Sequence, residues 1–163
     1  MASRIFRHYP ATMSERAYWL AAGFIFGALA VLVFHQGALA MLHSAGIARS
    51  AAYAMQPAHP FGIPQIWSTA FWGGLWGVLL AAAVVRLDGA RLVFAATLFG
   101  LVLPTLAAWF MVAAMKGQPL AAGFVPKAMA VGPIVNAAWG FGTGIGLAWL
   151  GRARGKRRVR RIL

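Results

Sequence analysis

The sequence predicts an all-α membrane protein with four transmembrane helices, and three observations support this. Its 163 residues are 61% hydrophobic, and its mean hydropathy is positive. Only Glu15 and Asp88 are acidic, so the chain has too few charges to cover the surface of a water-soluble domain. The apolar runs reach the ~20 residues that a helix needs to cross a bilayer, and they lack the alternation of a barrel strand.

Four apolar runs set the order of elements in a single membrane domain. The first run is longer than the apolar region of a cleaved signal peptide, so we expect it to remain as a span. The expected spans are approximately 17–42, 66–85, 92–115 and 128–151. They leave two longer loops at 43–65 and 116–127, a short loop at 86–91 and a basic tail at 152–163.

The basic residues lie mostly on one side of these spans. Twelve of the 15 fall before the first span, in the short loop or in the tail, and three fall in the longer loops: Arg49, Lys116 and Lys127. Cytoplasmic loops of membrane proteins carry the excess of Lys and Arg. We therefore expect a bacterial inner-membrane protein with both termini and the short loop in the cytoplasm, and with the longer loops outside.

The tail is the most basic part of the chain. Its cations are Arg152, Arg154, Lys156, Arg157, Arg158, Arg160 and Arg161. A basic run can bind any polyanion, but this one directly follows a span, where such clusters fix topology and attract anionic headgroups. Anionic lipid is the expected partner, and a protein or nucleic acid is the weaker alternative.

The second and fourth spans carry similar stripes of small residues. Sliding the sequence by 67 residues (69 to 136) lays Thr69, Gly73, Gly77 and Ala81 on Asn136, Gly140, Gly144 and Ala148. Such stripes let helix backbones approach closely in lipid. Gly23 and Gly27 match Ala96 and Gly100 if a six-residue gap is allowed. The pattern predicts two similar hairpins that form a parallel internal repeat.

Polar residues of the spans are expected in one outer layer of the bundle. They are His35, Gln36, Gln65, Ser68 and Asn136. One interpretation is a pocket in which His35 exchanges a proton or a hydrogen bond with a small ligand or a quinone headgroup. The other is interhelical hydrogen bonding that only holds the bundle together, and it is the favoured interpretation.

Trp72 and Trp76 lie four residues apart, deep in the second span. They are expected to fill grooves between helices; the alternative is stacking on a quinone or a carotenoid. A haem needs two axial ligands on facing helices, and His35 is the one histidine inside a predicted span. We therefore expect no cofactor, with quinone, carotenoid and haem as weak alternatives.

The sequence offers no catalytic constellation. It contains no cysteine, and both carboxylates are predicted on the cytoplasmic side. Thiolate chemistry, hydrolysis by a carboxylate-held metal and ion coupling through a membrane carboxylate all lack their residues. We therefore expect no enzymatic activity and no metal site.

The stretches FHQGALAMLH (34–43) and PQIWSTAFWGGLWG (64–77) resemble small, uncharacterised four-span inner-membrane proteins of proteobacteria. The resemblance implies a membrane location and brings no activity, cofactor or catalytic residue.

Three functions remain open on the sequence. The leading hypothesis is a non-enzymatic accessory subunit or helix–helix interaction module that associates with other membrane subunits or with itself. The alternatives are a small oligomeric transporter or channel, whose path is lined by the outer polar layer, and a quinone- or pigment-binding subunit of a membrane complex.

Overall fold

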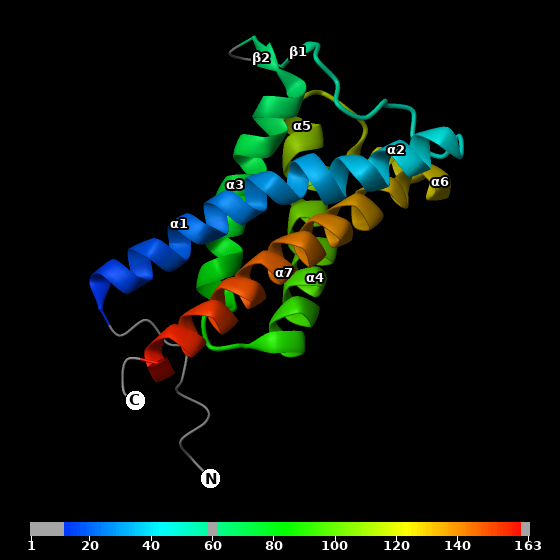
Figure 1. The fold of residues 1–163 in the computed structure, drawn as a ribbon. Coiled ribbons are helices and arrows are strands. Elements are labelled where there is room, and N and C mark those ends of the chain that lie inside the picture. The colour runs from blue at the N-terminus through cyan, green and yellow to red at the C-terminus, as the bar shows by residue number, and fades with distance from the viewer. Residues whose placement is uncertain (1–11, 59–61, 161–163) are drawn as a thin grey trace.

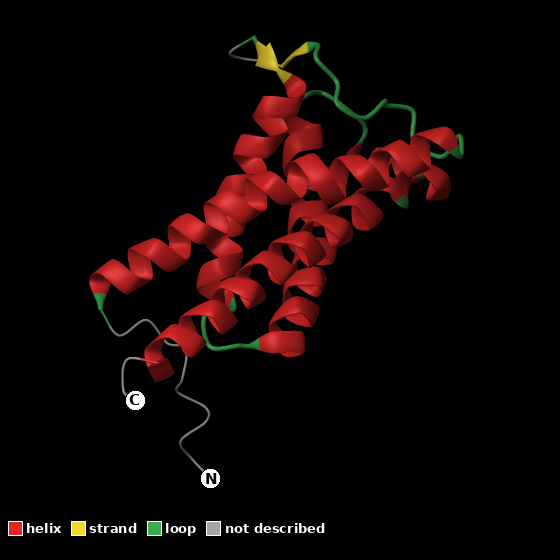
Figure 2. Ribbon diagram, viewed as in Figure 1, coloured by secondary structure: helices red, strands yellow, loops and turns green. Residues whose placement is uncertain are grey.

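The computed structural model describes residues 12–58 and 62–160, in which four long helices dominate (Figure 1, Figure 2). The first runs through α1 (Met13–Ala30), the π-helical turn η2 (Val31–His35) and α2 (Gln36–Ser44). The second is α3 (Gln65–Ala83). The third runs through α4 (Gly89–Leu106), the π-helical η3 (Ala107–Val112) and α5 (Ala113–Met115), and the fourth is α7 (Val131–Arg160).

Short elements occupy the two longer loops. In the first, β1 (Pro57–Ala58) pairs antiparallel with β2 (Ile63–Pro64). The carbonyls of Ala54 and Gln56 in this loop accept the N–H groups of Ile66 and Gln65, so the loop caps the start of α3. The second loop contains η4 (Leu120–Phe124) and α6 (Pro126–Met129).

Three of the long helices are long and apolar enough to cross a membrane: Met13–Ser44, Gln65–Ala83 and Gly89–Met115. This supports the predicted membrane protein. The apolar part of α7 is diluted by glycines, Asn136 and Thr143, and α7 does not meet the same criterion. The fourth span therefore stays a prediction. The structure shows that α7 packs extensively against α4.

The helix ends extend beyond the predicted spans at both termini. Thr12 caps α1 with its hydroxyl on the Glu15 N–H, while the Glu15 carboxylate accepts from the Thr12 N–H, and this capping box starts the helix at Met13. At the other end α7 continues to Arg160, into the predicted tail. The Arg152 side chain is exposed, the side chains of residues 154–160 are not described, and Arg161 lies outside the described residues.

The long helices form two layers that cross. In Figure 1, α1 and α7 run side by side in front of α3 and α4. α1 packs on α3, α7 packs on α4, and the two hairpins meet chiefly along α1 and α7. α3 and α4 follow each other in the chain but barely touch.

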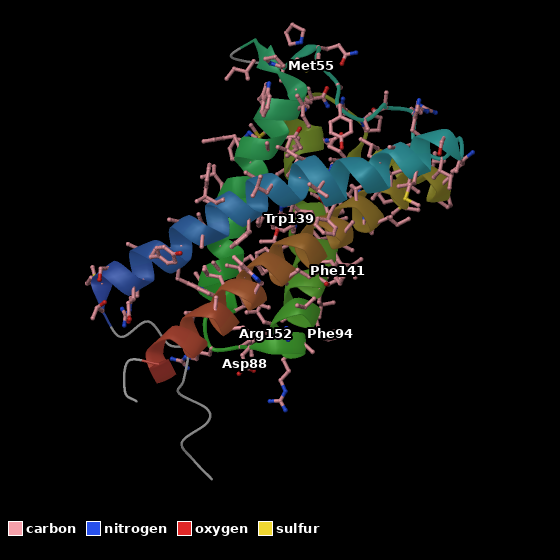
Figure 3. All side chains as sticks on the ribbon, viewed as in Figure 1. Met55, Asp88, Phe94, Trp139, Phe141 and Arg152 are labelled. Atoms are coloured by element: carbon pink, nitrogen blue, oxygen red, sulfur yellow. The ribbon has the colours of Figure 1, made fainter. Side chains whose placement is uncertain are left out.

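One end of the bundle gathers the start of α1, the connection between α3 and α4, and the end of α7 (Figure 1). Figure 3 places Asp88 and Arg152 together at this end. The buried Trp19 indole donates a 2.9 Å hydrogen bond to Ala81 O in the last turn of α3. This bond satisfies a carbonyl near a helix end, where helical donors run out.

Because the chain has no cysteine, single-cysteine variants test the topology cleanly. We expect a membrane-impermeant maleimide to label Ala51→Cys and Gln118→Cys from the periplasmic side, and to label Ala90→Cys only after the membrane is permeabilised. All three positions are exposed in the structure. Labelling of Ala90→Cys in intact spheroplasts would contradict the predicted orientation, because it would place the short loop outside the cytoplasm.

Candidate functional site

α1 and α3 approach so closely that only glycine fits between their backbones. An ideal Cβ on Gly23 would lie 2.5 Å from Gly77 O and 2.6 Å from Ala81 Cβ. An ideal Cβ on Gly27 would overlap Gly73 O and lie 3.0 Å from Gly77 Cα. A glycine inside a helix costs roughly 0.5–1 kcal/mol relative to alanine, which backbone contact along the whole seam can offset. Gly73, Gly77 and Ala81 belong to the stripe of small residues described in the sequence, and they lie at the contact between α3 and α1.

The α4–α7 hairpin has a contact of the same kind. An ideal Cβ on Gly140 would overlap Ala96 O and lie 3.2 Å from Gly100 Cα. One on Gly144 would lie 2.8 Å from Ala96 Cβ, and Ala148 is buried one turn further on. Alanine takes the place of one glycine here, and the backbones still meet.

The internal repeat itself stays a prediction, and these contacts match a register that differs from the predicted one by one helical turn. Gly77 packs on Gly23 and Gly27, the two residues that the predicted alignment pairs with Ala96 and Gly100, on which Gly140 packs. The offset between α3 and α7 that matches this packing is 63 residues (77 to 140), one helical turn less than the predicted 67. Small residues recur every four positions, so a slip of one turn matches the stripes almost equally well.

The two hairpins meet where glycines of α7 receive phenylalanines of α1. The Phe34 ring lies over Gly142 and the Phe26 ring over Gly146, so that a Cβ at either glycine would overlap a ring. Phe34 also packs edge-to-face on Phe141, with ring centroids 6.0 Å apart. These two glycines let α1 and α7 close against each other.

Trp139 lies at the centre of the bundle, where α1, α3 and α7 meet (Figure 3). It is 2% exposed, and its indole N–H donates a 2.9 Å hydrogen bond to Gly27 O. A Cβ on Gly73 would lie 3.3 Å from the same indole nitrogen. One tryptophan therefore fills the junction and hydrogen-bonds the glycine seam across the hairpins.

The predicted polar layer is divided between separate hydrogen bonds. Gln36 is 4% exposed, and its Oε1 accepts from the Tyr53 N–H at 2.8 Å. The Asn136 amide donates to the buried Thr105 hydroxyl at 3.0 Å. Gln36 thus ties the first helix to its loop, while Asn136 ties α7 to α4.

The remaining residues of the layer differ in their surroundings. Gln65 is exposed at the start of α3, Ser68 is half-buried, and the Thr69 hydroxyl donates to Gln65 O within its own helix. The Nδ1 atom of His35 is buried and has no hydrogen-bond partner.

The two deep tryptophans of α3 face different surroundings. Trp76 is half-buried and packs edge-to-face on Phe99 of α4, with centroids 6.1 Å apart. Trp72 is 60% exposed and packs edge-to-face on Phe71. Trp76 thus fills the seam between α3 and α4, as the packing interpretation expects, whereas Trp72 lies on the surface.

Sequence reasoning missed two residues of this region. Tyr53 lies in a loop without periodic pattern, so no local signal connects it to Gln36. Thr105 follows Pro104 in α4, and no spacing in the sequence marks its hydroxyl as buried. Among the residues that the structure describes, no group of three His, Cys, Asp or Glu could hold a metal ion.

Comparison of the chain with known proteins returned no matching family model, no significantly similar curated protein and no significantly similar solved structure.

Substituting Gly77 tests the close backbone contact. Gly77→Ala places a methyl group on Gly23 O, so we expect the free energy of unfolding in detergent to fall by about 1–3 kcal/mol. Gly37→Ala is the matched control, because a Cβ there meets nothing within 4 Å and alanine favours a helix by about 0.5–1 kcal/mol. Equal stability of the two variants would refute the packing account.

Substituting Trp139 tests the central hydrogen bond. Trp139→Phe removes the donor to Gly27 O, and we expect a loss of about 1 kcal/mol in addition to the loss of buried volume. Trp76→Phe is the control, since no hydrogen bond joins the Trp76 indole to another described residue. Thermal unfolding of both variants measures the difference, and an equal loss would remove the bond from the account.

Proposed function

We propose that this chain is a non-enzymatic integral protein of the bacterial inner membrane that acts by association, as an accessory subunit or helix–helix interaction module. The observation that carries the proposal is an aromatic cluster on α1 and α3, formed by the exposed Phe71 and Trp72 and the half-buried Phe24. The ring centroids of Phe24 and Phe71 are 6.0 Å apart, and those of Phe71 and Trp72 are 6.1 Å apart.

The glycine stripes face inward and leave the surface to larger side chains. Ideal Cβ atoms on the glycines of α3 all meet α1 or its side chains, including Gly74 beneath the Phe24 ring. Partner contacts would therefore form through the aromatic cluster rather than through a free glycine face. Aromatic residues are enriched at the energetic centres of protein interfaces.

Trp72 is the key residue of this face. It lies seven residues into α3, about 10 Å from the helix start, and no hydrogen bond joins its indole N–H to another described residue. Tryptophans in lipid contact favour the membrane interface, where this group finds water or headgroups. A partner helix that offers an acceptor would satisfy it at depth.

The two hairpins also support the proposed internal repeat. In the register of the packing, Trp76 of α3 corresponds to Trp139 of α7, and both indoles pack toward the first helix of the other hairpin. A parallel repeat of this kind places matching helices in the same direction through the membrane.

The proposed orientation puts the basic end of the bundle in the cytoplasm. There Arg152, exposed at the end of α7, lies beside the start of α4, with its Nη2 3.8 Å from an ideal Cβ on Gly89. With the basic tail beyond it, this end would contact anionic headgroups.

An oligomeric transporter or channel has less support. Its path was expected to be lined by His35, Gln36 and Asn136. Gln36 and Asn136 instead bond to Tyr53 and Thr105, so each side chain already has a hydrogen-bond partner within the chain.

Native mass spectrometry of gently solubilised membranes tests the proposal. We expect the 17.4 kDa chain in a larger complex, and we expect Trp72→Leu to release it while the protein stays folded. Trp149→Leu is the matched control, because Trp149 is 65% exposed on α7, away from the aromatic cluster. A wild-type protein that is monomeric and without partners would contradict the proposal.

A further inference from the structure

His35 is half-buried, and it differs from the three polar side chains that are buried in the long helices. Gln36, Thr105 and Thr143 are all hydrogen-bonded, the last to Trp139 O in its own helix. Within the described residues, His35 Nδ1 is the one buried side-chain nitrogen or oxygen that lacks a partner. In an apolar surrounding, such an atom forfeits the hydrogen bond it would make in water.

The histidine lies in a turn with unusual geometry. Residues Val31–His35 form the π-helical segment η2. Such segments are rare in proteins, and many of those that occur lie at functional sites. Val31 packs its Cγ2 onto Gly73, and His35 follows four residues later in a segment that contacts α3 and α7. The buried Nδ1 atom of His35 therefore belongs to a segment that packs on both of these helices.

Tyr53 holds this turn from the loop outside. Its hydroxyl donates to Leu32 O at 2.8 Å, and its N–H donates to the Gln36 side chain at 2.8 Å. These bonds bracket His35 in the sequence. Tyr53 has a φ of 55°, a strained conformation for a bulky residue, which marks positions that the surrounding structure or a function requires. Two long-range hydrogen bonds from a strained residue thus hold the π-helical turn η2 and the residue that follows it.

The surroundings restrict what could bind at His35. The sequence has no Asp, Glu, Lys or Arg between Arg16 and Arg49 or between Arg49 and Arg86. The charged residues of α1, η2, α2 and α3 are therefore Glu15 and Arg16 alone, and both lie near the start of α1, far along the helix from His35. A charged ligand would be costly there. A neutral imidazole carries one donor and one acceptor, and it suits a hydroxyl or a carbonyl equally well.

We propose that His35 Nδ1 is the polar contact of a binding site for an uncharged, lipid-dissolved molecule with a hydroxyl or carbonyl on an aromatic or quinonoid ring. The apolar body of the ligand remains among the helices, its ring oxygen bonds to Nδ1, and Tyr53 fixes the π-helical turn that presents the imidazole. Tyr53 is a positioning residue in this site. The inference does not depend on the proposed partner subunit.

The test uses ¹⁵N-histidine-labelled protein in lipid nanodiscs with decylubiquinol and decylubiquinone as probes. We expect a saturable change of the His35 Nδ1 resonance, assigned by its absence in His35→Gln, and no change with decylbenzene, which lacks the oxygens. Binding measured by tryptophan fluorescence should weaken about tenfold in His35→Leu, the loss expected for one hydrogen bond in an apolar site.

Three further variants separate binding from folding. His35→Gln keeps an acceptor and should retain part of the affinity, while Tyr53→Phe removes the bond to Leu32 O and should weaken binding with the helix content unchanged. Thr143→Val is the control, since its hydroxyl bonds only within α7, and it should bind as the wild type does. An unshifted His35 resonance, or equal affinity of wild type and His35→Leu, would overturn the proposal.

Discussion

The contact between the backbones of Gly27 and Gly73, joined to α7 by the Trp139 indole, is the constraint on which the rest of the structure depends. Lipid provides no hydrophobic drive between helices, so van der Waals contact at close range has to hold them. Glycine permits that approach at the cost of helix propensity, and the indole bond fixes the depth at which α7 crosses α1. α1, α3 and α7 meet at this one contact, so it sets the register in which the two hairpins pair.

The two hairpins pack closely along α1 and α7 but barely touch along α3 and α4. α7 presents Gly142 and Gly146 to the phenylalanines of α1. In the register of the packing, α3 has Leu79 where α7 has Gly142, and Leu79 is exposed. α3 and α4 barely touch, and the Trp76 ring packs on Phe99 between them. The same asymmetry leaves the aromatic cluster on the outer face of the first hairpin, where the proposed partner would bind.

Composition and periodicity predicted the helical membrane fold, the approximate element order and the small-residue faces, because these follow from local hydropathy and from side-chain spacing. The first span was predicted from about residue 17, whereas α1 begins at Met13. The pair Thr12 and Glu15 matches a capping-box pattern, which could have indicated this start. The internal repeat stays a prediction. The helix contacts match an offset of 63 residues (77 to 140) instead of 67, a difference of one turn that a four-residue stripe cannot distinguish. The clamp of Tyr53 on Gln36 and Leu32 lay beyond prediction, since a contact between a loop and a π-helical turn leaves no periodic trace. The same holds for the bond from the Asn136 amide to the Thr105 hydroxyl, since only the packed bundle brings these two residues together.

A double-mutant cycle between Gly27 and Gly73 tests the central contact most directly. Each single alanine adds a methyl group to the same interface, and the first to be introduced already separates the helices. The account predicts that Gly27→Ala and Gly73→Ala each lower the free energy of unfolding, and that the double variant loses clearly less than the sum of the two. Strict additivity, or stability equal to that of the wild type, would contradict it.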